Sequence, residues 1–319
     1  MLPLLALLAF ISVARAEASE LELVRVQFAR SDHELSGLAV QGKHLVLVAD
    51  DKEDHYLYKA TLAGKRYAIT RLLDLNRIEG FRPYLDSLQG EARVPEKDRR
   101  IDLEGIAICG RKTYLINERV RQIVVVEDEK KISRLPLDFE GYKALFDGGP
   151  NAGFEGIAAD CGTDTLYVAK EREPRQIFVV DLKTQQITKT FDFPPSERAG
   201  QKVIDPFTGK GLFAVGSDIS DLAFDGGFLY VLERNTYEVT KLDAKTFEVL
   251  GRVSYFKTEK PLYETGEPFG QAEALRLSPG EIMIGVDNND TPLTHFATKT
   301  YGVSGKVGAI MTFKRPKGF

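Results

Sequence analysis

One five-residue phrase returns five times along this chain. Each copy places an apolar residue before a carboxylate or hydroxyl residue, and small or branched residues follow. The copies are Leu35–Ala39, Leu103–Ala107, Phe154–Ala158, Ile219–Ala223 and Ala272–Arg276. Such a repeat indicates stacked equivalent units, because a single unit of this size cannot bury its apolar face alone. The repeat therefore constrains the fold more than any other feature of the chain.

A β-rich pattern follows each copy of the phrase. A turn such as Gly110-Arg111 or Gly226-Gly227 leads to a second apolar run, and each pair has the turn residues and branched side chains of a β-hairpin. Third and fourth strands follow the first four hairpins, and a third follows the last. These strands are expected at Tyr56–Ala60 and Ala68–Leu75, Gln122–Glu127 and Ile132–Phe139, Gln176–Asp181 and Ile187–Phe193, Glu238–Asp243 and Val249–Phe256, and Gly308–Phe313.

The last unit lacks a fourth strand, and a candidate for it lies at the other end of the chain. Leu21–Phe28 has the pattern of the fourth strands and would close a ring, which hides sheet edges from unwanted pairing. The expected fold is all-β: a five-bladed β-propeller of four-stranded antiparallel blades. A six-bladed ring is the alternative, with a degenerate blade in 76–101. Long loops are expected at 76–101, 140–152, 194–216, 257–271 and 288–306.

Composition and charge narrow the class of protein. The 319 residues are 43% apolar and 28% charged, as in ordinary globular proteins. A net charge of −4 gives no reason to expect a nucleic-acid partner.

Residues 1–16 resemble a secretory signal that ends in Ala14-Arg15-Ala16, with a buried N-terminal helix as the alternative. Residues 17–319 are expected to form a single propeller domain without a membrane span, exported to the periplasm or secreted, and monomeric.

The chain contains two cysteines, Cys109 and Cys161, each followed by glycine. They occupy matching places in neighbouring repeats. An oxidising compartment would permit a disulfide between them, although two inner strands of adjacent blades can lie too far apart for the bond. Both outcomes stay open at this stage. Two isolated thiols do not favour a zinc site.

The antiparallel blades bring polar residues to one face of the ring. We call it the loop face; it carries the start of strand one and the ends of strands two and four. Binding residues usually lie on such loops. A first tier opens strand one: Ser36, Glu104, Glu155, Ser220 and Glu273. Two residues earlier stand Glu34, Asp102, Gly153, Asp218 and Gln271. A second tier closes strand two: Asp50, Glu118, Glu171, Glu233 and Asp287.

Several carboxylates in a narrow ring repel one another, so something must compensate their charge. A hard cation such as Ca²⁺ would do so, because it takes six to eight oxygen ligands. The predicted metal ligands are Glu104, Glu155, Glu273, Glu118, Glu171, Glu233 and Asp287, with the first three foremost. Structural ion pairs to Arg119, Arg172 and Arg234 are a second possibility, and protonated carboxyl groups are a third. The oxygen-rich run Asp287–Asp290 is open to two interpretations, ligand or Asx turn.

The repeat phrases resemble the SdiA-regulated propeller family, notably at Asp102–Ile106, Asn117–Arg119, Gly153–Ile157, Ala169–Pro174 and Ser217–Leu222. Asn151–Ile157 and Asp287–Asn289 are also similar to the phytase-like family, described as having esterase-like activity. Together the resemblances cover roughly residues 30–313. They imply an exported bacterial propeller with an axial calcium site, and they imply little about substrate. The pair Ser220-Asp221 departs from the Ser-Gly of the family pattern.

Three functions fit these residues. The first is a propeller whose axial cation binds a small-molecule or protein ligand without catalysis. The second is a metal-assisted hydrolase of phosphate or carboxylic esters, in which Glu118 or Glu171 serves as base and Arg119, Arg172 or Arg234 holds the anion. The third is a protein-binding platform on the loop face. A nucleophilic triad finds little support, since the chain has four histidines and no Gly-x-Ser-x-Gly elbow.

Overall fold

The computed structural model describes most of the chain from residue 18 onward. The described residues are 18–29, 35–49, 55–64, 66–90, 96, 99–146, 152–199, 202–204, 211–213, 218–263 and 270–319; for 202–204 and 211–213 only the backbone is described. The predicted signal at 1–16 and the predicted ring residues Glu34 and Asp50 lie outside them. No helix in these ranges is long and apolar enough to cross a membrane.

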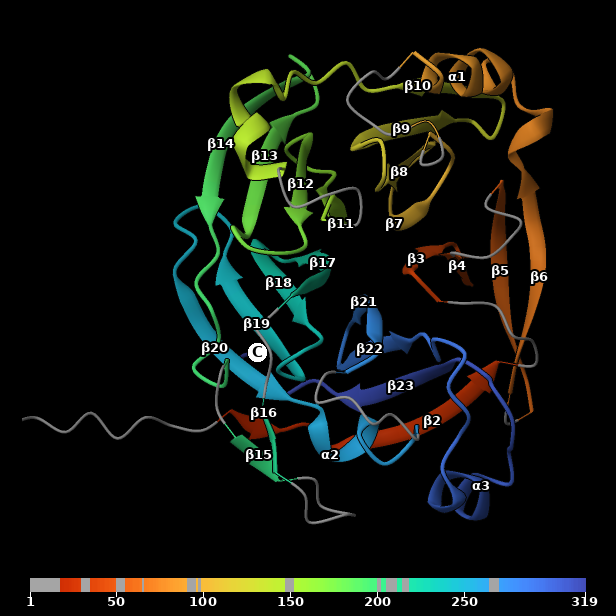
Figure 1. The fold of residues 1–319 in the computed structure, drawn as a ribbon, viewed down its shortest axis with the longest axis vertical. Helices are drawn as coiled ribbons and strands as arrows, with labels where there is room; N and C mark the ends of the chain where they lie inside the picture. Colours follow the sequence, from red (N-terminus) through yellow and green to blue (C-terminus); the bar gives the residue numbers. More distant parts are fainter. Residues whose placement is uncertain are drawn as a thin grey trace, which may run out of the picture.

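The described strands form four-stranded antiparallel units arranged around a central axis (Figure 1). The predicted all-β propeller is confirmed, and we call each unit a blade. Blade 1 has β3 (Gly37–Gln41), β4 (His44–Val48), β5 (Tyr56–Ala63) and β6 (Arg66–Asp74); blade 2 has β7 (Leu103–Cys109), β8 (Lys112–Asn117), β9 (Gln122–Glu127) and β10 (Lys131–Arg134); blade 3 has β11 (Phe154–Asp160), β12 (Thr165–Lys170), β13 (Gln176–Asp181) and β14 (Gln186–Asp192). Blade 4 has β17 (Ile219–Asp225), β18 (Phe228–Glu233), β19 (Glu238–Asp243) and β20 (Val249–Ser254); blade 5 has β21 (Ala272–Ser278), β22 (Glu281–Val286) and β23 (Ala309–Lys314).

The N-terminal strand completes blade 5, as the sequence predicts. β2 (Leu23–Ala29) pairs antiparallel with β23, so that Phe28 lies opposite Ala309. It also meets β6 of blade 1 in a short parallel pairing. A two-residue strand, β1 (Ser19–Glu20), pairs with the outer edge of blade 4. The inner strands β3, β7, β11, β17 and β21 contact their neighbours in cyclic order, which closes the ring.

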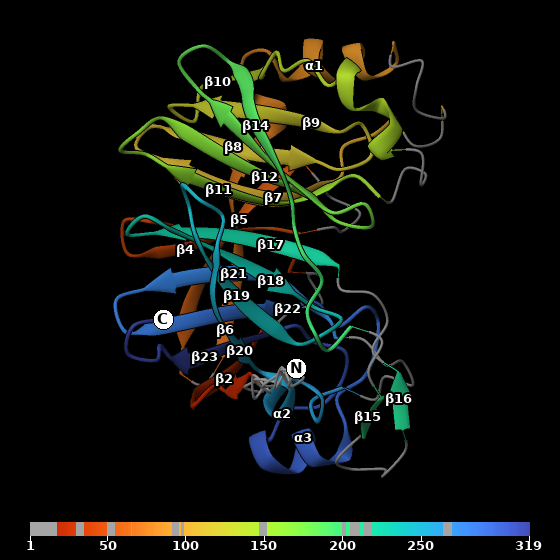
Figure 2. The same ribbon diagram turned by 90° about the vertical axis from the view of Figure 1, so that its left-hand side faces the viewer.

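The long segments between blades carry short elements where the sequence predicts loops. These are η1 (Leu75–Arg77), α1 (Phe81–Leu88), η3 (Glu140–Phe146), α2 (Phe256–Glu259), α3 (His295–Tyr301) and the hairpin of β15 (Lys202–Ile204) and β16 (Gly211–Phe213), which stands off one side of the ring (Figure 2). The described part of 76–101 holds no strand. Its helix α1 buries Phe81, Tyr84 and Leu88 against blade 2, in the segment where the six-bladed alternative would place a degenerate blade.

The two cysteines form a disulfide that joins neighbouring inner strands. Cys109 ends β7 and Cys161 follows β11, and their Cα atoms lie 5.5 Å apart. This separation is typical of a disulfide, so the inner strands of adjacent blades approach closely enough for the bond. The link therefore holds blades 2 and 3 together at the end of the axis opposite the loop face.

Candidate metal centre

A β-bulge lies at the repeated carboxylate or serine of four inner strands. In blade 2, the three residue steps from Leu103 to Ile106 on β7 lie opposite only two steps on β8. In blade 3, the three steps from Phe154 to Ile157 on β11 lie opposite only two steps on β12. The inner strands of blades 4 and 5 have the same irregularity around Ser220 and Glu273. A bulge inserts one unpaired residue and re-aims its side chain. The repeated phrase is thus the sequence of a bulge that turns Glu or Ser toward the axis.

Glycine after the bulge lets the inner strands approach one another. A Cβ on Gly105 would lie 2.5 Å from the carbonyl oxygen of Glu155, and one on Gly37 would lie 2.9 Å from that of Glu104. Real side chains do not tolerate such contacts with backbone. The small residue is therefore required by the close packing of β3, β7 and β11, which brings their carboxylates together.

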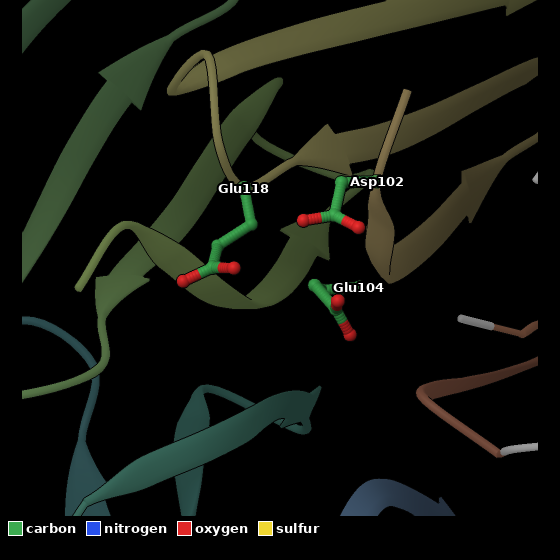
Figure 3. A group of neighbouring side chains, drawn as sticks. All are labelled: Asp102, Glu104 and Glu118. Carbon is green, nitrogen blue, oxygen red and sulfur yellow. The ribbon is translucent and has the colours of Figure 1, made fainter. Parts of the chain in front are cut away.

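The described residues contain two groups of carboxylates close enough to share a metal ion, and Glu118 belongs to both. Asp102, Glu104 and Glu118 form one group, in which an oxygen of each residue lies within 4.8 Å of the others (Figure 3). Glu118, Glu155 and Glu171 form the second group at the same separation. Glu118 and Glu171 are only 5% and 1% exposed. Carboxylates from β7, β11 and the ends of β8 and β12 thus converge at the axis.

Burial and mutual repulsion oppose ionisation of these groups. Burial, followed by the charge of Glu171, raises the pKa of Glu118 to about 8. Burial raises the pKa of Glu171 to about 7, although Arg234 and Arg172 oppose the shift. The pKa of Glu155 is raised well above its usual value, by burial first and then by the surrounding carboxylates Glu171, Glu104, Glu118 and Glu273. The cluster would therefore gain from a partner that neutralises it.

The three arginines of the second tier contact these acids. Arg234 pairs with Glu273 through one guanidinium nitrogen and with Glu171 through another at 2.5 Å. Arg119 lies 2.5 Å from Asp102, and Arg172 lies 3.0 Å from Glu171. Burial opposes the charge of Arg234, but its carboxylate neighbours outweigh this effect and raise its pKa. Ion pairs thus compensate part of the acidic charge.

Glu273, one of the three foremost predicted ligands, lies at the edge of the cluster. Burial raises its pKa to about 7, and the pairing with Arg234 opposes this rise. Its charge and that of Glu104 both act on Glu155 and raise its pKa. The two groups that could hold a metal among the described residues do not include Glu273.

Two further predicted ligands lie away from these groups. Glu233 is fully buried and accepts a hydrogen bond from Thr240 at 2.6 Å, with Arg175 at 3.6 Å. Asp287 accepts a hydrogen bond from the backbone N–H of Asn289 at 3.0 Å, which is the Asx-turn geometry. The sequence places both at the second tier, but the described geometry does not bring them into either carboxylate group.

The buried acids that were not among the predicted ligands include Asp102 and Glu259. Asp102 is fully buried and belongs to the first group; its place two residues before Glu104 is the signal that could have included it. Glu259 ends α2, accepts the backbone N–H of Gln271 at 2.6 Å, and has a pKa raised to about 8 by burial. The segment of Glu259 has no counterpart in the repeat, so no pattern indicated it.

Asp221 occupies the position that is glycine in blades 1, 2 and 3. Its carboxylate accepts backbone N–H groups of Leu222 and Leu275, each at 2.7 Å, and of Ile157. These residues belong to β17, β21 and β11. Because Asp221 replaces glycine, one carboxylate hydrogen-bonds to three inner strands. It lies next to the acidic tiers, on the side away from the loop face.

The donor set suits a hard cation. Every candidate ligand is a carboxylate oxygen, which suits Ca²⁺, Mg²⁺ or Mn²⁺ and disfavours copper and thiolate-type zinc sites. Burial, together with neighbouring carboxylates, raises the pKa values of Glu118 and Glu171, and a cation that binds the ionised groups would offset this cost. The residues therefore fit a divalent cation on the axis.

Two solved structures are similar to this chain. The glutaminyl cyclase of Myxococcus xanthus is 10% identical with a TM-score of 0.54, and the match covers 94% of this chain and 100% of that one. The PQQ-bound aldose sugar dehydrogenase of Streptomyces coelicolor is 12% identical with a TM-score of 0.49, over 94% and 99% of the two chains. The likeness to the cyclase supports the propeller fold alone.

Residues 92–274 match the family described as SdiA-regulated. The matched segment spans more than half of the chain, from the approach to β7 to the bulge of β21. It includes the bulges and the carboxylates of both groups. The chain therefore belongs to the SdiA-regulated family.

Proposed function

We propose that the protein is an exported propeller that binds Ca²⁺ on its axis and uses the loop face to bind a small-molecule or protein ligand. One observation carries the proposal: carboxylate oxygens of Glu118, Glu155 and Glu171 lie within 4.8 Å of one another at an enclosed site. Without a cation, three ionised groups at this separation repel strongly. A calcium ion would replace that repulsion by attraction and accept all three as ligands.

The charges around the axis support a cation in addition to the ion pairs. Three arginines contact the acids, while the carboxylates of this region are more numerous. They are Asp102, Glu104, Glu118, Glu155, Glu171, Asp218, Glu273 and Asp287. Ion pairing to Arg119, Arg172 and Arg234 therefore leaves an excess of negative charge unless protons or a cation neutralise it. Glu118 belongs to both groups and is the residue whose removal should affect the cation most.

The disulfide supports export. Structural disulfides form and persist in oxidising compartments and are rare in the cytosol. Cys109 and Cys161 are bonded in the structure, and the periplasm or the exterior of the cell would maintain that bond.

The decisive experiment is thermal melting with calcium and with a chelator. A ligand that binds only the folded state raises its stability by about 2.7 kcal/mol at a concentration a hundred times the Kd. Calcium should raise the melting temperature of the wild-type protein and leave that of Glu118→Gln nearly unchanged. Glu127→Gln is the matched control, because this 53% exposed carboxylate of blade 2 pairs with Lys112 away from the axis. Equal calcium responses in Glu118→Gln and Glu127→Gln would exclude the axial site.

The hydrolase of phosphate or carboxylic esters remains the second candidate. One observation favours it: the Arg172 side chain is 47% exposed beside Glu171, so an anionic ester could reach the guanidinium. Arg119 and Arg234 are paired with acids and largely buried, which makes them poorer anion ligands. A panel of p-nitrophenyl phosphates and short acyl esters tests this candidate. Activity that persists in both Glu118→Gln and Glu171→Gln would place hydrolysis elsewhere.

A further inference from the structure

The axis opens into a second pocket on the face opposite the acids. It has a volume of about 230 Å³ and is lined by residues from all five inner strands. The later part of each repeated phrase supplies this lining, beyond the bulge that carries the carboxylates. Ala39, Ala107, Ala158 and Ala223 stand at the same position of the phrase in four blades, and each keeps a small exposed area of 3% to 8%. Four methyl groups therefore leave the axis hollow at this level.

Blade 5 breaks the alanine pattern with Arg276. This residue lines the same pocket and is half-buried there. Among the described residues, Asp225 is the charged group that acts on Arg276, but the Asp225 carboxylate is ion-paired with Arg315. No described residue therefore forms a hydrogen bond or an ion pair with the Arg276 guanidinium. Burial lowers the pKa of Arg276, which means that its positive charge is incompletely compensated.

The pocket is separated from the acidic site by Asp221. The backbone N–H groups that its carboxylate accepts belong to pocket-lining residues, Ile157, Leu222 and Leu275. Asp221 precedes Leu222 and so lies between the carboxylate level and the alanine level. Asp221 and the backbone groups it binds therefore lie between an anion at Arg276 and the acidic tiers.

We propose that this pocket binds a small monocarboxylic acid with an apolar body, whose carboxylate pairs with Arg276 and whose body contacts the ring of alanines. A guanidinium binds a carboxylate through two parallel hydrogen bonds. The volume lies below the range typical of drug-sized ligands, which limits the occupant to a small molecule. Arg276 is the only charged residue of the described lining, which favours a monoanion over a dianion such as sulfate. This site is distinct from the proposed calcium centre in residues, charge and face.

Isothermal titration calorimetry with hexanoate and benzoate tests the proposal, and hexanamide and benzamide serve as neutral counterparts. The wild-type protein should bind at least one acid saturably and its amide at least about tenfold more weakly, because a charge-assisted hydrogen bond contributes about 1.5–3 kcal/mol. Sulfate should not compete at equal concentration. Saturable binding of neither acid, or equal binding of acid and amide, would overturn the proposal.

The variant Arg276→Ala gives blade 5 the residue that the other blades have at this position, so the fold should tolerate it. Acid binding should fall by about tenfold or more in Arg276→Ala and be partly retained in Arg276→Lys, which keeps the charge. Glu118→Gln should bind the acids as the wild type does. Undiminished binding in Arg276→Ala overturns the assignment. The calcium response of Arg276→Ala should equal that of the wild type, which separates this site from the axial cation.

Discussion

The carboxylate of Asp221 accepts the backbone N–H of Leu275 at 2.7 Å, across the boundary between blades 4 and 5. The repeat has glycine at this position in three blades, so a larger residue is accommodated only because its neighbours stay small. Gly156 is one such neighbour: a Cβ on it would lie 2.8 Å from the backbone of Asp221. The Asp221 carboxylate, which stands where three other blades have glycine, thus joins three inner strands.

Replacing Asp221 should destabilise the protein more than most buried substitutions. Asp221→Ala leaves three buried N–H groups without their acceptor, and each unsatisfied group costs about 1–3 kcal/mol. The free energy of unfolding should fall by about 3 kcal/mol or more, as measured by denaturant melts. Asp221→Asn should also lose stability, because its amide N–H₂ cannot accept a hydrogen bond. A variant that unfolds like the wild type would show that the three bonds contribute little.

The metal-free protein should become less stable as the pH rises from about 5 to about 9. The folded-state pKa values of Glu118, Glu171 and Glu273 are raised to about 8, 7 and 7, above the unfolded value of about 4.3. A raised carboxyl pKa contributes stability that is present below the unfolded pKa and is lost as the pH passes the folded pKa. Melting temperatures in chelator across this range check the prediction. Calcium should raise the melting temperature of the protein more at the upper end of this pH range, because it binds the deprotonated carboxylates.

Glu155→Gln should have opposite effects with and without calcium. Glu155 is surrounded by four carboxylates, so removing its charge relieves repulsion in the metal-free protein. Near pH 8 the variant should melt at a higher temperature than the wild type in chelator and at a lower temperature in saturating calcium. Melting curves under both conditions measure the difference. A variant that melts lower in chelator as well would indicate that Glu155 serves a structural ion pair instead.

Gly105→Ala should destabilise the ring by about 1–3 kcal/mol, the usual cost of overpacking. The added Cβ meets the carbonyl oxygen of Glu155 at 2.5 Å, so β7 and β11 must separate. Gly141→Ala is the control, because a Cβ there meets nothing within 4 Å. Chemical denaturation of both variants measures the difference, and equal stabilities would contradict the close approach of the inner strands.

Reducing the disulfide should lower the free energy of unfolding by about 2–4 kcal/mol. Cys109 and Cys161 are 52 residues apart in sequence, so their bond restricts a long loop of the unfolded chain. Melting with and without a reductant gives the effect. A Cys109→Ser/Cys161→Ser double variant should melt near the reduced wild type and show no response to the reductant.

The repeat made the fold predictable because four of its five copies mark a bulge on an inner strand. Turn residues and branched side chains located the hairpins, and the unmatched strand near the N-terminus indicated the closure by β2. The short helices were not predicted, since they lie in segments without a repeat. The disulfide was left open, because the distance between neighbouring inner strands depends on the packing of Gly105 and its counterparts.

The carboxylate site was predicted in part. Glu118 and Glu171 follow the last residues of β8 and β12, and both turn toward the axis. Glu233 was predicted for the same tier, but it lies opposite Ile219, where blades 2 and 3 have Asn117 and Lys170, and it bonds Thr240. A difference of one residue along the strand therefore decides whether the glutamate joins the axial carboxylates or forms a buried ion pair. Sequence patterns locate strand ends only to within a few residues, so this difference could not be predicted.

The pairing of β2 with β23 also has a consequence for the order of assembly. β2 leaves the ribosome well before β23, because blades 1 to 4 and the first two strands of blade 5 lie between them in the sequence. During synthesis, β2 therefore lacks its antiparallel partner while the intervening blades emerge. Joining these two strands is a long-range step with a high entropic cost. The ring can become fully cooperative only after β23 has emerged.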